Sequence, residues 1–256
     1  MSLTKQKKPN VQIAADAETL AHQCVDLLVS SVEKTVKEKK VFHLAISGGK
    51  SPQRFFELLG SEQKSLKLPW DKIHLFWVDE RYVPHDSQYS NYKLAADTFL
   101  KKVPIPKENI HAIPTDMDDF DSAAKQYEKT IRSIFNIKPG HTPKFDLIIL
   151  GMGSDGHTGS LFPNTTAPFD TKDLACVVYL LDQKLPDEML NRITLTHPVI
   201  CAASQIVVLV SGVEKAKTLK EVLEGPPDEI RYPIHVLWPV LDKVLWLIDS
   251  PAAKML

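Results

Sequence analysis

The sequence predicts an α/β fold in which helices cover a mostly parallel β-sheet. Apolar segments rich in Val, Ile and Leu alternate along the chain with segments of helical periodicity, a pattern typical of parallel sheets with helical crossovers. Seven apolar segments are predicted as strands: residues 41–47, 72–78, 145–151, 175–181, 192–197, 206–211 and 244–249. Seven strands make a plausible sheet. We expect one domain over residues 1–256, with allowance for a small lobe around residues 160–200.

The helices are predicted from the spacing of apolar residues between these strands. Within residues 18–40, Leu20, Cys24, Leu27, Leu28 and Val32 recur near helical spacing. Four further segments have the same character: residues 51–59, 89–100, 122–135 and 214–223. Two segments rich in Pro and Gly, residues 138–144 and 224–229, are predicted as loops.

Composition indicates a soluble globular protein. Of its 256 residues, 43% are hydrophobic and 25% are charged, which supplies enough apolar material for a core. The 31 basic and 32 acidic residues nearly cancel, so no overall field favours nucleic acid or a membrane surface. No apolar run approaches the roughly 18 residues of a membrane span, and no targeting signal is evident. Three widely spaced cysteines, Cys24, Cys176 and Cys201, argue against a disulfide scaffold or zinc knuckle. We expect a cytoplasmic protein, acting as a monomer.

Polar clusters follow three of the predicted strands, and the first is the turn "SGGKSP" after residues 41–47. Gly48 and Gly49 let the backbone approach an anion closely, and the free N–H groups of the following helix favour phosphate. Pro52 suits the first turn of that helix, with Ser51 as its cap. The motif matches neither a Walker loop nor GxGxxG, and an ordinary tight turn remains the alternative.

The second cluster is "DER", Asp79 to Arg81, directly after residues 72–78. Charges beside a core strand cost desolvation unless they are paired or used, so a structural ion pair is one interpretation. In the other, Arg81 clamps a phosphate with two parallel hydrogen bonds. Ser90 and Asn91, further along this loop, are expected to cap or brace it.

The third cluster lies in "LGMGSDGHTGSLFP", after residues 145–151. Its glycines permit a sharp turn that presents Asp155 and His157 outward. An unperturbed imidazole has a pKa of about 6.5, and a carboxylate can orient it as a base. The chain has nine histidines, and a lone histidine is more often structural than catalytic, so the surrounding motif carries the interpretation. Because ligands of open parallel sheets bind outside the carboxyl ends of strands, the three clusters are expected to converge on one crevice.

Taken together, "SGGxSP", "DERxVP" with a following "SN", and "LGxGxDGHTxSLFP" resemble the 6-phosphogluconolactonase family. The similarity extends through "RITLTHPVI" to "VSGVEKAKTLKEVL". The resemblance implies a Rossmann-like α/β/α sandwich, shared with glucosamine-6-phosphate deaminases and ribose-5-phosphate isomerases. It also implies hydrolysis of a phosphorylated sugar lactone.

The resemblance also implies roles for individual residues. His157 is expected to be the general base, with Asp155 orienting its ring. Arg81 and Lys215 are expected to bind the substrate phosphate, and Arg192 to lie near the lactone or its phosphate. The turn is expected to cradle the phosphate from its backbone side, through Ser47, Gly48, Gly49 and Ser51.

Hydrolysis of a lactone requires only two contributions from these residues. A water must lose a proton as it attacks C1, and the carbonyl oxygen needs stabilisation as it becomes an oxyanion. Backbone N–H groups of the glycine-rich loop and Arg192 are both candidates for that second role. The absence of a GxSxG motif favours direct attack by water. No cofactor is expected, and no metal, because the carboxylates and histidines lack a convincing ligand spacing.

Two other functions fit parts of the sequence. A sugar-phosphate isomerase or amino-sugar deaminase on the same fold would shuttle protons between C1 and C2, but deaminases show "DEY" where this chain has "DER". A non-catalytic sugar-phosphate sensor would bind through the same loops without turnover. The complete "DGHT" loop argues against the sensor.

Overall fold

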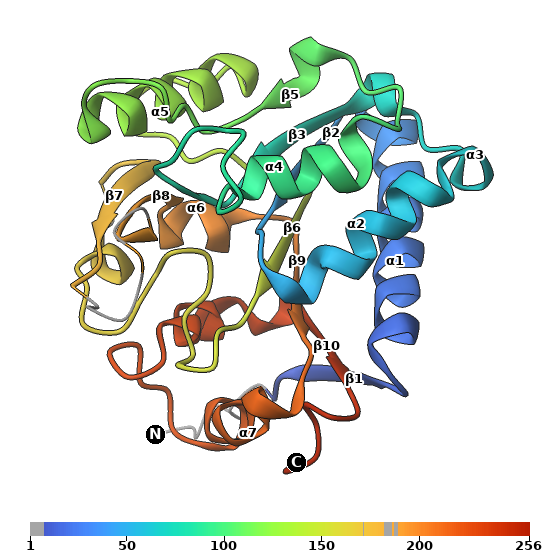
Figure 1. The fold of residues 1–256 in the computed structure, drawn as a ribbon, viewed down its shortest axis with the longest axis vertical. Coiled ribbons are helices and arrows are strands. Elements are labelled where there is room, and N and C mark those ends of the chain that lie inside the picture. The colour runs from blue at the N-terminus through green and yellow to red at the C-terminus, as the bar shows by residue number, and fades with distance from the viewer. Residues whose placement is uncertain (1–7, 171, 182–185, 187–188) are drawn as a thin grey trace, which may run out of the picture.

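The predicted α/β class is confirmed by the computed structural model, which describes residues 8–170, 172–181, 186 and 189–256. The main sheet has seven strands in the order β1-β10-β9-β6-β2-β3-β5, and every pairing is parallel (Figure 1). Its strands are β1 (Asn10–Ala14), β2 (Phe42–Ile46), β3 (Ile73–Trp77), β5 (Ile110–His111), β6 (Leu147–Gly151), β9 (Gln205–Val210) and β10 (Val244–Asp249).

A second, three-stranded sheet corrects the predicted strand set. It consists of β4 (Asp79–Arg81), β8 (Asn191–Leu195) and β7 (Ala175–Tyr179), paired antiparallel in that order. The prediction that segments 175–181 and 192–197 belong to the main sheet is therefore wrong. Only residues 180–190 separate β7 from β8, which is too short for the crossover of a dozen or more residues that parallel strands need. The main sheet instead includes β1, which is largely exposed, and the two-residue β5, and neither segment was predicted as a strand.

Helices flank the main sheet, and five of them follow the predicted ranges closely, whereas α3 and α6 were not predicted. In Figure 1, α1 and α2 lie side by side on one side of the sheet, and α5 lies on the other. The helices are α1 (Ala17–Lys39), α2 (Lys50–Ser61), α3 (Gln63–Leu66), α4 (Asn91–Ala95), α5 (Phe120–Ile134), α6 (His197–Ala202) and α7 (Ala216–Glu224). A π-helical turn, Ala96–Leu100, continues α4, and 3₁₀ segments span Trp70–Lys72, Lys107–Asn109, Ala167–Phe169, Val213–Lys215 and Pro233–Lys243.

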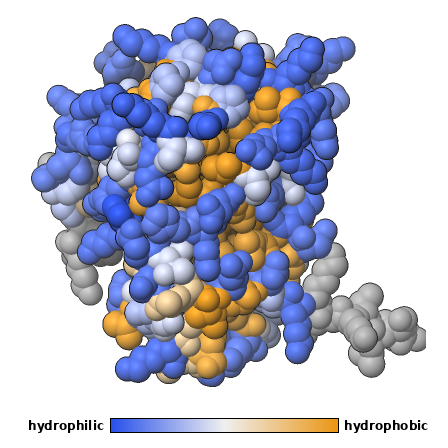
Figure 2. Space-filling model, turned by 90° about the vertical axis from the view of Figure 1, so that its right-hand side faces the viewer, coloured by the Kyte–Doolittle hydropathy of each residue, from blue (hydrophilic) through white to orange (hydrophobic). Residues whose placement is uncertain are grey.

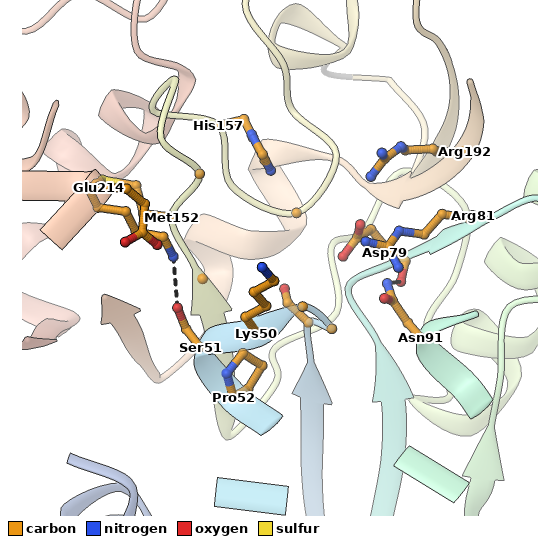
Figure 3. A pocket seen from close by; sticks show the side chains of 17 residues that line it. Lys50, Ser51, Pro52, Asp79, Arg81, Asn91, Met152, His157, Arg192 and Glu214 are labelled. Atoms are coloured by element: carbon orange, nitrogen blue, oxygen red, sulfur yellow. Dashed lines mark hydrogen bonds between the residues drawn. The ribbon is translucent and has the colours of Figure 1, made fainter. Parts of the chain in front are cut away.

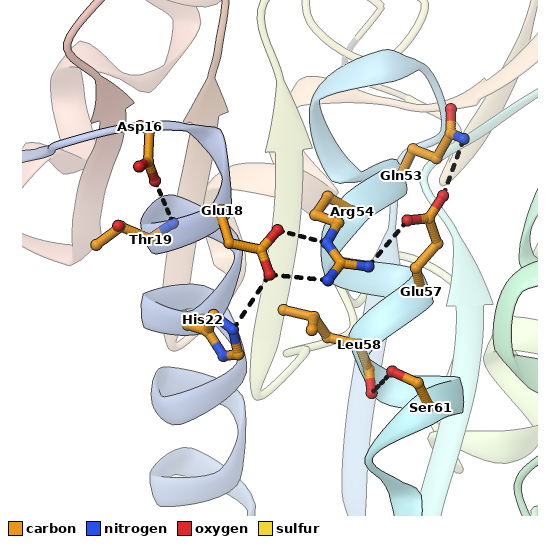
Figure 4. Close-up of polar contacts among 9 residues, drawn as sticks. All are labelled: Asp16, Glu18, Thr19, His22, Gln53, Arg54, Glu57, Leu58 and Ser61. Carbon is orange, nitrogen blue, oxygen red and sulfur yellow. Dashed lines mark hydrogen bonds and ion pairs between the residues drawn. The ribbon is translucent and has the colours of Figure 1, made fainter.

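Helix α1 is attached to the rest of the protein by an ion pair to α2 at the surface and by buried apolar side chains. Asp16 begins α1 by accepting a hydrogen bond from the backbone N–H of Thr19 (2.7 Å). Arg54 of α2 donates to both carboxylate oxygens of Glu18, at 2.6 and 2.8 Å (Figure 4). Both side chains are about half exposed, so solvent screens this ion pair and it contributes little to stability. The fully buried side chains of α1, such as Leu20 and Leu28, therefore provide most of its attachment.

Among the described residues, no helix is both long enough and apolar enough to cross a bilayer. The face at the right of Figure 1 presents mostly hydrophilic residues, with an apolar band between them (Figure 2).

The carboxyl ends of β2, β3 and β6 are tied together where the site lies. The backbone N–H of Ser47, just after β2, donates to the carbonyl of Ile149 in β6 (2.9 Å). The N–H of Val78, just after β3, donates to the carbonyl of Ile46 in β2 (2.9 Å). The loops that leave these strands therefore start from fixed, neighbouring points, as the topology of an open parallel sheet predicts.

Glu80 in β4 organises the loop that leads to α4. Its buried carboxylate accepts hydrogen bonds from the backbone N–H groups of Arg81, Asn91 and Tyr92, and from the hydroxyl of Ser90. Burial raises the pKa of the Glu80 carboxyl, and the three backbone hydrogen bonds oppose that rise. Two of those N–H groups belong to the first turn of α4, so Glu80 satisfies donors that the helix itself leaves unpaired.

We expect Glu80→Gln to destabilise the protein by about 1–3 kcal/mol, because an amide cannot accept the four hydrogen bonds and buried donors lose their partner. Urea denaturation measures this change. The Glu57→Gln variant, at a partly exposed surface position of α2, is the matched control, with an expected change below about 0.5 kcal/mol. A Glu80→Gln free energy of unfolding equal to that of the control would contradict this account of the loop.

Candidate active site

The predicted crevice exists as a pocket of about 210 Å³ at the carboxyl ends of the central strands (Figure 3). Eight of the nine predicted site residues line it: Ser47, Gly48, Gly49, Ser51, Arg81, His157, Arg192 and Lys215. The ninth, Asp155, contacts His157 without lining the pocket. Sequence reasoning assigned no role at a site to several further lining residues: Lys50, Met152, Gly159 and Glu214. Lys50 and Glu214 adjoin residues of the quoted motifs, so proximity to Ser51 and Lys215 was the available signal.

His157 and Asp155 form a hydrogen-bonded pair on the loop after β6. The imidazole Nδ1 lies 2.6 Å from Oδ1 of Asp155, and the backbone N–H of His157 also donates to that oxygen (3.2 Å). Burial raises the pKa of the Asp155 carboxyl, but hydrogen bonds and the charge interaction with His157 outweigh it, and the pKa lies below its ordinary value. An ionised carboxylate only accepts, so the proton of this contact belongs to Nδ1. The Nε2 atom is then the proton-accepting nitrogen of the neutral ring.

Gly153 makes room for this pair. A Cβ atom at position 153 would lie 2.2 Å from Nδ1 of His157 and 2.6 Å from Oδ1 of Asp155, so any side chain would displace both. Within the loop, the N–H of Gly153 donates to the carbonyl of His157 (2.9 Å), and that of Gly156 donates to the carbonyl of Gly153 (3.1 Å). These amides are therefore engaged in shaping the loop.

The turn after β2 begins α2 earlier than predicted. Gly49 is the N-cap of α2, with a φ of 97° that favours glycine, and Lys50 is the first helical residue. The expectation that Ser51 caps the helix is wrong, because the left-handed turn at Gly49 starts the helix before Ser51. Pro52 does lie in the first turn, as predicted. The Ser51 hydroxyl instead accepts a hydrogen bond from Nζ of Lys215 (2.8 Å).

Lys215 reaches the pocket from the segment after β9. Asp249, buried at the end of β10, shapes this segment by accepting from the hydroxyl of Ser211 (2.5 Å) and the N–H of Gly212 (3.2 Å). Burial lowers the pKa of the Lys215 ammonium, while the nearby carboxylates of Glu214 and Asp249 oppose that shift. Lys215 is thus a partly desolvated cation facing the pocket.

Two arginines lie side by side on adjacent strands of the small sheet. Arg81 of β4 and Arg192 of β8 are directly paired in the antiparallel register, and both line the pocket. Arg81 donates from Nη1 to the carbonyl of Tyr89 (2.7 Å), and Arg192 donates from Nε to the carbonyl of Met189 (3.1 Å). Burial, followed by the charge of Arg81, lowers the pKa of Arg192 to about 10, so it stays protonated at neutral pH. A buried cation directly beside a second cation on the neighbouring strand favours an anion nearby.

Three buried polar atoms of the pocket wall have no hydrogen-bond partner among the described residues: Oγ of Ser47, Nε of Arg81 and Oδ1 of Asn91. Asn91 lies between two loops, because its Nδ2 donates to the carbonyl of Asp79 (2.8 Å) and its Oδ1 packs against Gly48. A Cβ atom at position 48 would lie 1.9 Å from that oxygen, so only glycine fits there. Ser90 caps α4 by accepting from the N–H of Lys93 (3.1 Å), which confirms its predicted role.

Asp79 connects the two sides of the site. Its carboxylate, almost fully buried, accepts from the hydroxyl of Ser160 (2.8 Å), which lies on the loop that carries His157. The interpretation of this cluster as a structural ion pair does not describe Asp79, whose carboxylate accepts its hydrogen bond from a hydroxyl group. In Figure 3, Asp79, Arg81 and Asn91 lie together on one side of the pocket, with Ser51 on the other.

No group of three or more His, Cys, Asp or Glu side chains suited to a metal ion occurs within the part of the chain that the structure describes. All three cysteines are free thiols, and burial raises the pKa of Cys201 to about 11 and that of Cys176 to about 12.

Comparison with known proteins extends the similarity over almost the whole chain. The family model for glucosamine-6-phosphate isomerases/6-phosphogluconolactonase matches residues 15–246. A 6-phosphogluconolactonase from Nostoc is 39% identical over 250 residues, covering 97% of this chain and 99% of the relative. One from Synechocystis is 36% identical over 248 residues, covering 97% and 98%.

Solved structures share the fold. A 6-phosphogluconolactonase from Thermotoga maritima is 28% identical, with a TM-score of 0.77, covering 95% of this chain and 100% of that one. A monomeric glucosamine-6-phosphate deaminase is 22% identical, with a TM-score of 0.82 and coverage of 96% and 100%, which shows the shared fold alone. From the family model and the full-length relatives together, the chain belongs to the glucosamine-6-phosphate isomerase/6-phosphogluconolactonase family.

Proposed function

We propose that this protein hydrolyses 6-phospho-D-glucono-1,5-lactone to 6-phospho-D-gluconate, the second step of the oxidative pentose phosphate pathway. The observation that carries the proposal is a histidine, oriented by a carboxylate, in a pocket that also holds two arginines and a lysine. Relatives at 36–39% identity over nearly their full length are named 6-phosphogluconolactonases, and they support the same activity.

In the proposed reaction, His157 is the general base. With Nδ1–H donating to Asp155, Nε2 accepts a proton from a water molecule as its oxygen attacks C1 of the lactone. The carbonyl oxygen becomes an oxyanion in the tetrahedral intermediate. When the intermediate collapses, the bond between C1 and the ring oxygen breaks, and the proton on His157 passes to that leaving oxygen. Water is consumed, and the imidazole returns to its starting state.

Arg192 is the proposed oxyanion donor. The sequence left open whether the glycine-rich loop or Arg192 has this role. The N–H groups of Gly153 and Gly156 already donate within the loop, which favours the guanidinium. A buried cation stabilises a developing negative charge most strongly where water is excluded from the site.

Arg81 and Lys215 are the proposed phosphate ligands, together with the backbone turn at Gly48 and Gly49. All four residues line the same pocket, and the turn leads into the N-terminus of α2, where free N–H groups favour anions. Holding the phosphate at a distance from C1 positions the lactone ring against His157.

The proposal includes a cytoplasmic location and a monomeric state. Free cysteines, two of them buried, are compatible with a reducing compartment. Sedimentation velocity of the purified protein measures the oligomeric state, and a single species near the monomer mass of 28.8 kDa is expected.

The activity itself is tested by two substrates. With freshly made 6-phosphogluconolactone, we expect acid release well above spontaneous hydrolysis, and with glucosamine 6-phosphate we expect no ammonia. Release of ammonia would identify a deaminase instead. Binding of 6-phosphogluconate without any acceleration of hydrolysis would identify the non-catalytic sensor.

We expect His157→Asn to lower kcat by roughly 10²-fold or more, the usual range for loss of a general base, with little change in affinity for 6-phosphogluconate. Asparagine keeps a polar side chain of similar size but cannot accept the proton. Stopped-flow acid release and calorimetry measure the two quantities. The exposed His22→Asn variant serves as control. Near-normal kcat in His157→Asn would mean that the histidine is structural.

The rate should fall on acidification in a single-proton step, because a protonated imidazole cannot accept the proton of water. The lowered pKa of Asp155 keeps its carboxylate ionised through this range, since a carboxyl with a depressed pKa loses its charge only at lower pH. A pH profile of kcat checks this expectation. A two-proton acid limb would show that Asp155 titrates together with His157.

Replacement of Arg81 or Lys215 by Ala should raise KM far more than it lowers kcat, because binding of the distant phosphate is lost. Neither change should affect hydrolysis of glucono-1,5-lactone, which lacks the phosphate. Lys217→Ala, an exposed lysine two residues from Lys215, is the matched control. Unchanged KM in both variants would refute the assignment.

A further inference from the structure

We propose that Phe162 is a positioning residue that sets His157 and Arg192 relative to each other, an inference that rests on the proposed lactonase function. Phe162 is not among the residues that line the pocket, so it acts through the two side chains that do.

The aromatic ring of Phe162 contacts both functional groups. The imidazole of His157 stacks on it, with ring centroids 4.0 Å apart and planes inclined by 27°. The guanidinium carbon of Arg192 lies over the same ring, 4.9 Å from its centroid. Both distances are within the range of favourable stacking and cation–π contacts.

The two contacts of His157 constrain different freedoms. The hydrogen bond to Asp155 fixes the direction of Nδ1, but the imidazole plane can still tilt about that bond. Stacking on a flat ring fixes the plane. With both in place, the direction of Nε2 is set, and general-base catalysis depends on that direction.

The backbone around Phe162 is held firmly enough for this role. Ser160 donates its hydroxyl to Asp79 (2.8 Å), and the N–H of the fully buried Leu161 donates to the carbonyl of Thr158 (3.0 Å). The carbonyl of Phe162 accepts from the hydroxyl of Thr165 (2.9 Å). The ring thus projects from a segment that is fixed on both sides.

Arg192 gains an orienting contact that its hydrogen bond does not supply. Its Nε donates to the carbonyl of Met189, which fixes one edge of the guanidinium, while the face of Phe162 limits the rotation of its plane. The ring is an uncharged surface that a desolvated cation tolerates, and it introduces no carboxylate that would compete with an anionic substrate.

The experiment compares Phe162→Leu, which removes the ring and keeps an apolar side chain, with Phe162→Tyr, which keeps the ring. Phe169→Leu is the matched control, because Phe169 is exposed and lies on a neighbouring 3₁₀ segment. We expect Phe162→Leu to lower kcat roughly tenfold and to weaken 6-phosphogluconate binding several-fold. Phe162→Tyr should restore both, and Phe169→Leu should resemble the wild-type protein. Equal kcat and affinity in Phe162→Leu and Phe169→Leu would overturn the inference.

A double-mutant cycle separates positioning from general structural support. Because Phe162 acts through His157 as well as Arg192, Phe162→Leu should lower kcat by a clearly smaller factor in the His157→Asn background than in the wild-type background, the remaining loss coming from Arg192. An equal loss in both backgrounds would overturn the inference.

A spectroscopic measurement is independent of turnover. The ring current of Phe162 should shift the His157 ring-proton NMR signals upfield, and Phe162→Leu should abolish this shift. Its presence in a wild-type protein that fails to hydrolyse the lactone would refute the proposed function and retain the contact. Its absence would overturn the inference whatever the activity.

Discussion

Two adjacent buried carboxylates, Asp79 and Glu80, hold the candidate site together. Glu80 accepts from three backbone N–H groups and thereby joins β4 to the first turn of α4. Asp79 accepts from Ser160 and so joins the same strand to the loop of His157. Buried charges are stabilised only when their hydrogen bonds are complete, so each carboxylate enforces the position of the segments that donate to it. The pocket is the space that these tied segments enclose.

Close packing of side chains against two glycines also holds the pocket in shape. Gly48 lets the Asn91 amide approach the turn after β2, and Gly153 lets the imidazole lie against the backbone. In each contact a side chain lies so close to the glycine backbone that a Cβ atom on that residue would overlap with it. The functional groups are therefore held at short range by tight packing as well as by hydrogen bonds, which restricts alternative rotamers in a small pocket.

The sequence was sufficient for the fold class and for most of the pocket wall, because both depend on patterns within short segments. Periodicity identified β2, β3, β6, β9 and β10, and the three motifs identified His157 and Arg81. Pairing between distant segments was harder. β1 is largely exposed and β5 has only two residues, so neither has a burial pattern that periodicity could detect. The composition of β7 and β8 resembles that of the parallel strands, and only the short connection between them indicates that they pair antiparallel. The contact of Phe162 with both His157 and Arg192 depends on tertiary geometry, which no motif records.

The place of β1 in the main sheet has a consequence for synthesis of the chain. Among the residues that the structure describes, β1 pairs with β10 alone, and the contact between Ala14 and Ser250 joins residues 236 positions apart. During translation, β1 leaves the ribosome before β10 and cannot pair with it until all the residues between them have been made. The loop that this pairing closes is long, so this edge of the sheet forms late. Until then both strands present open backbone edges, and the nascent protein is exposed to aggregation in that interval.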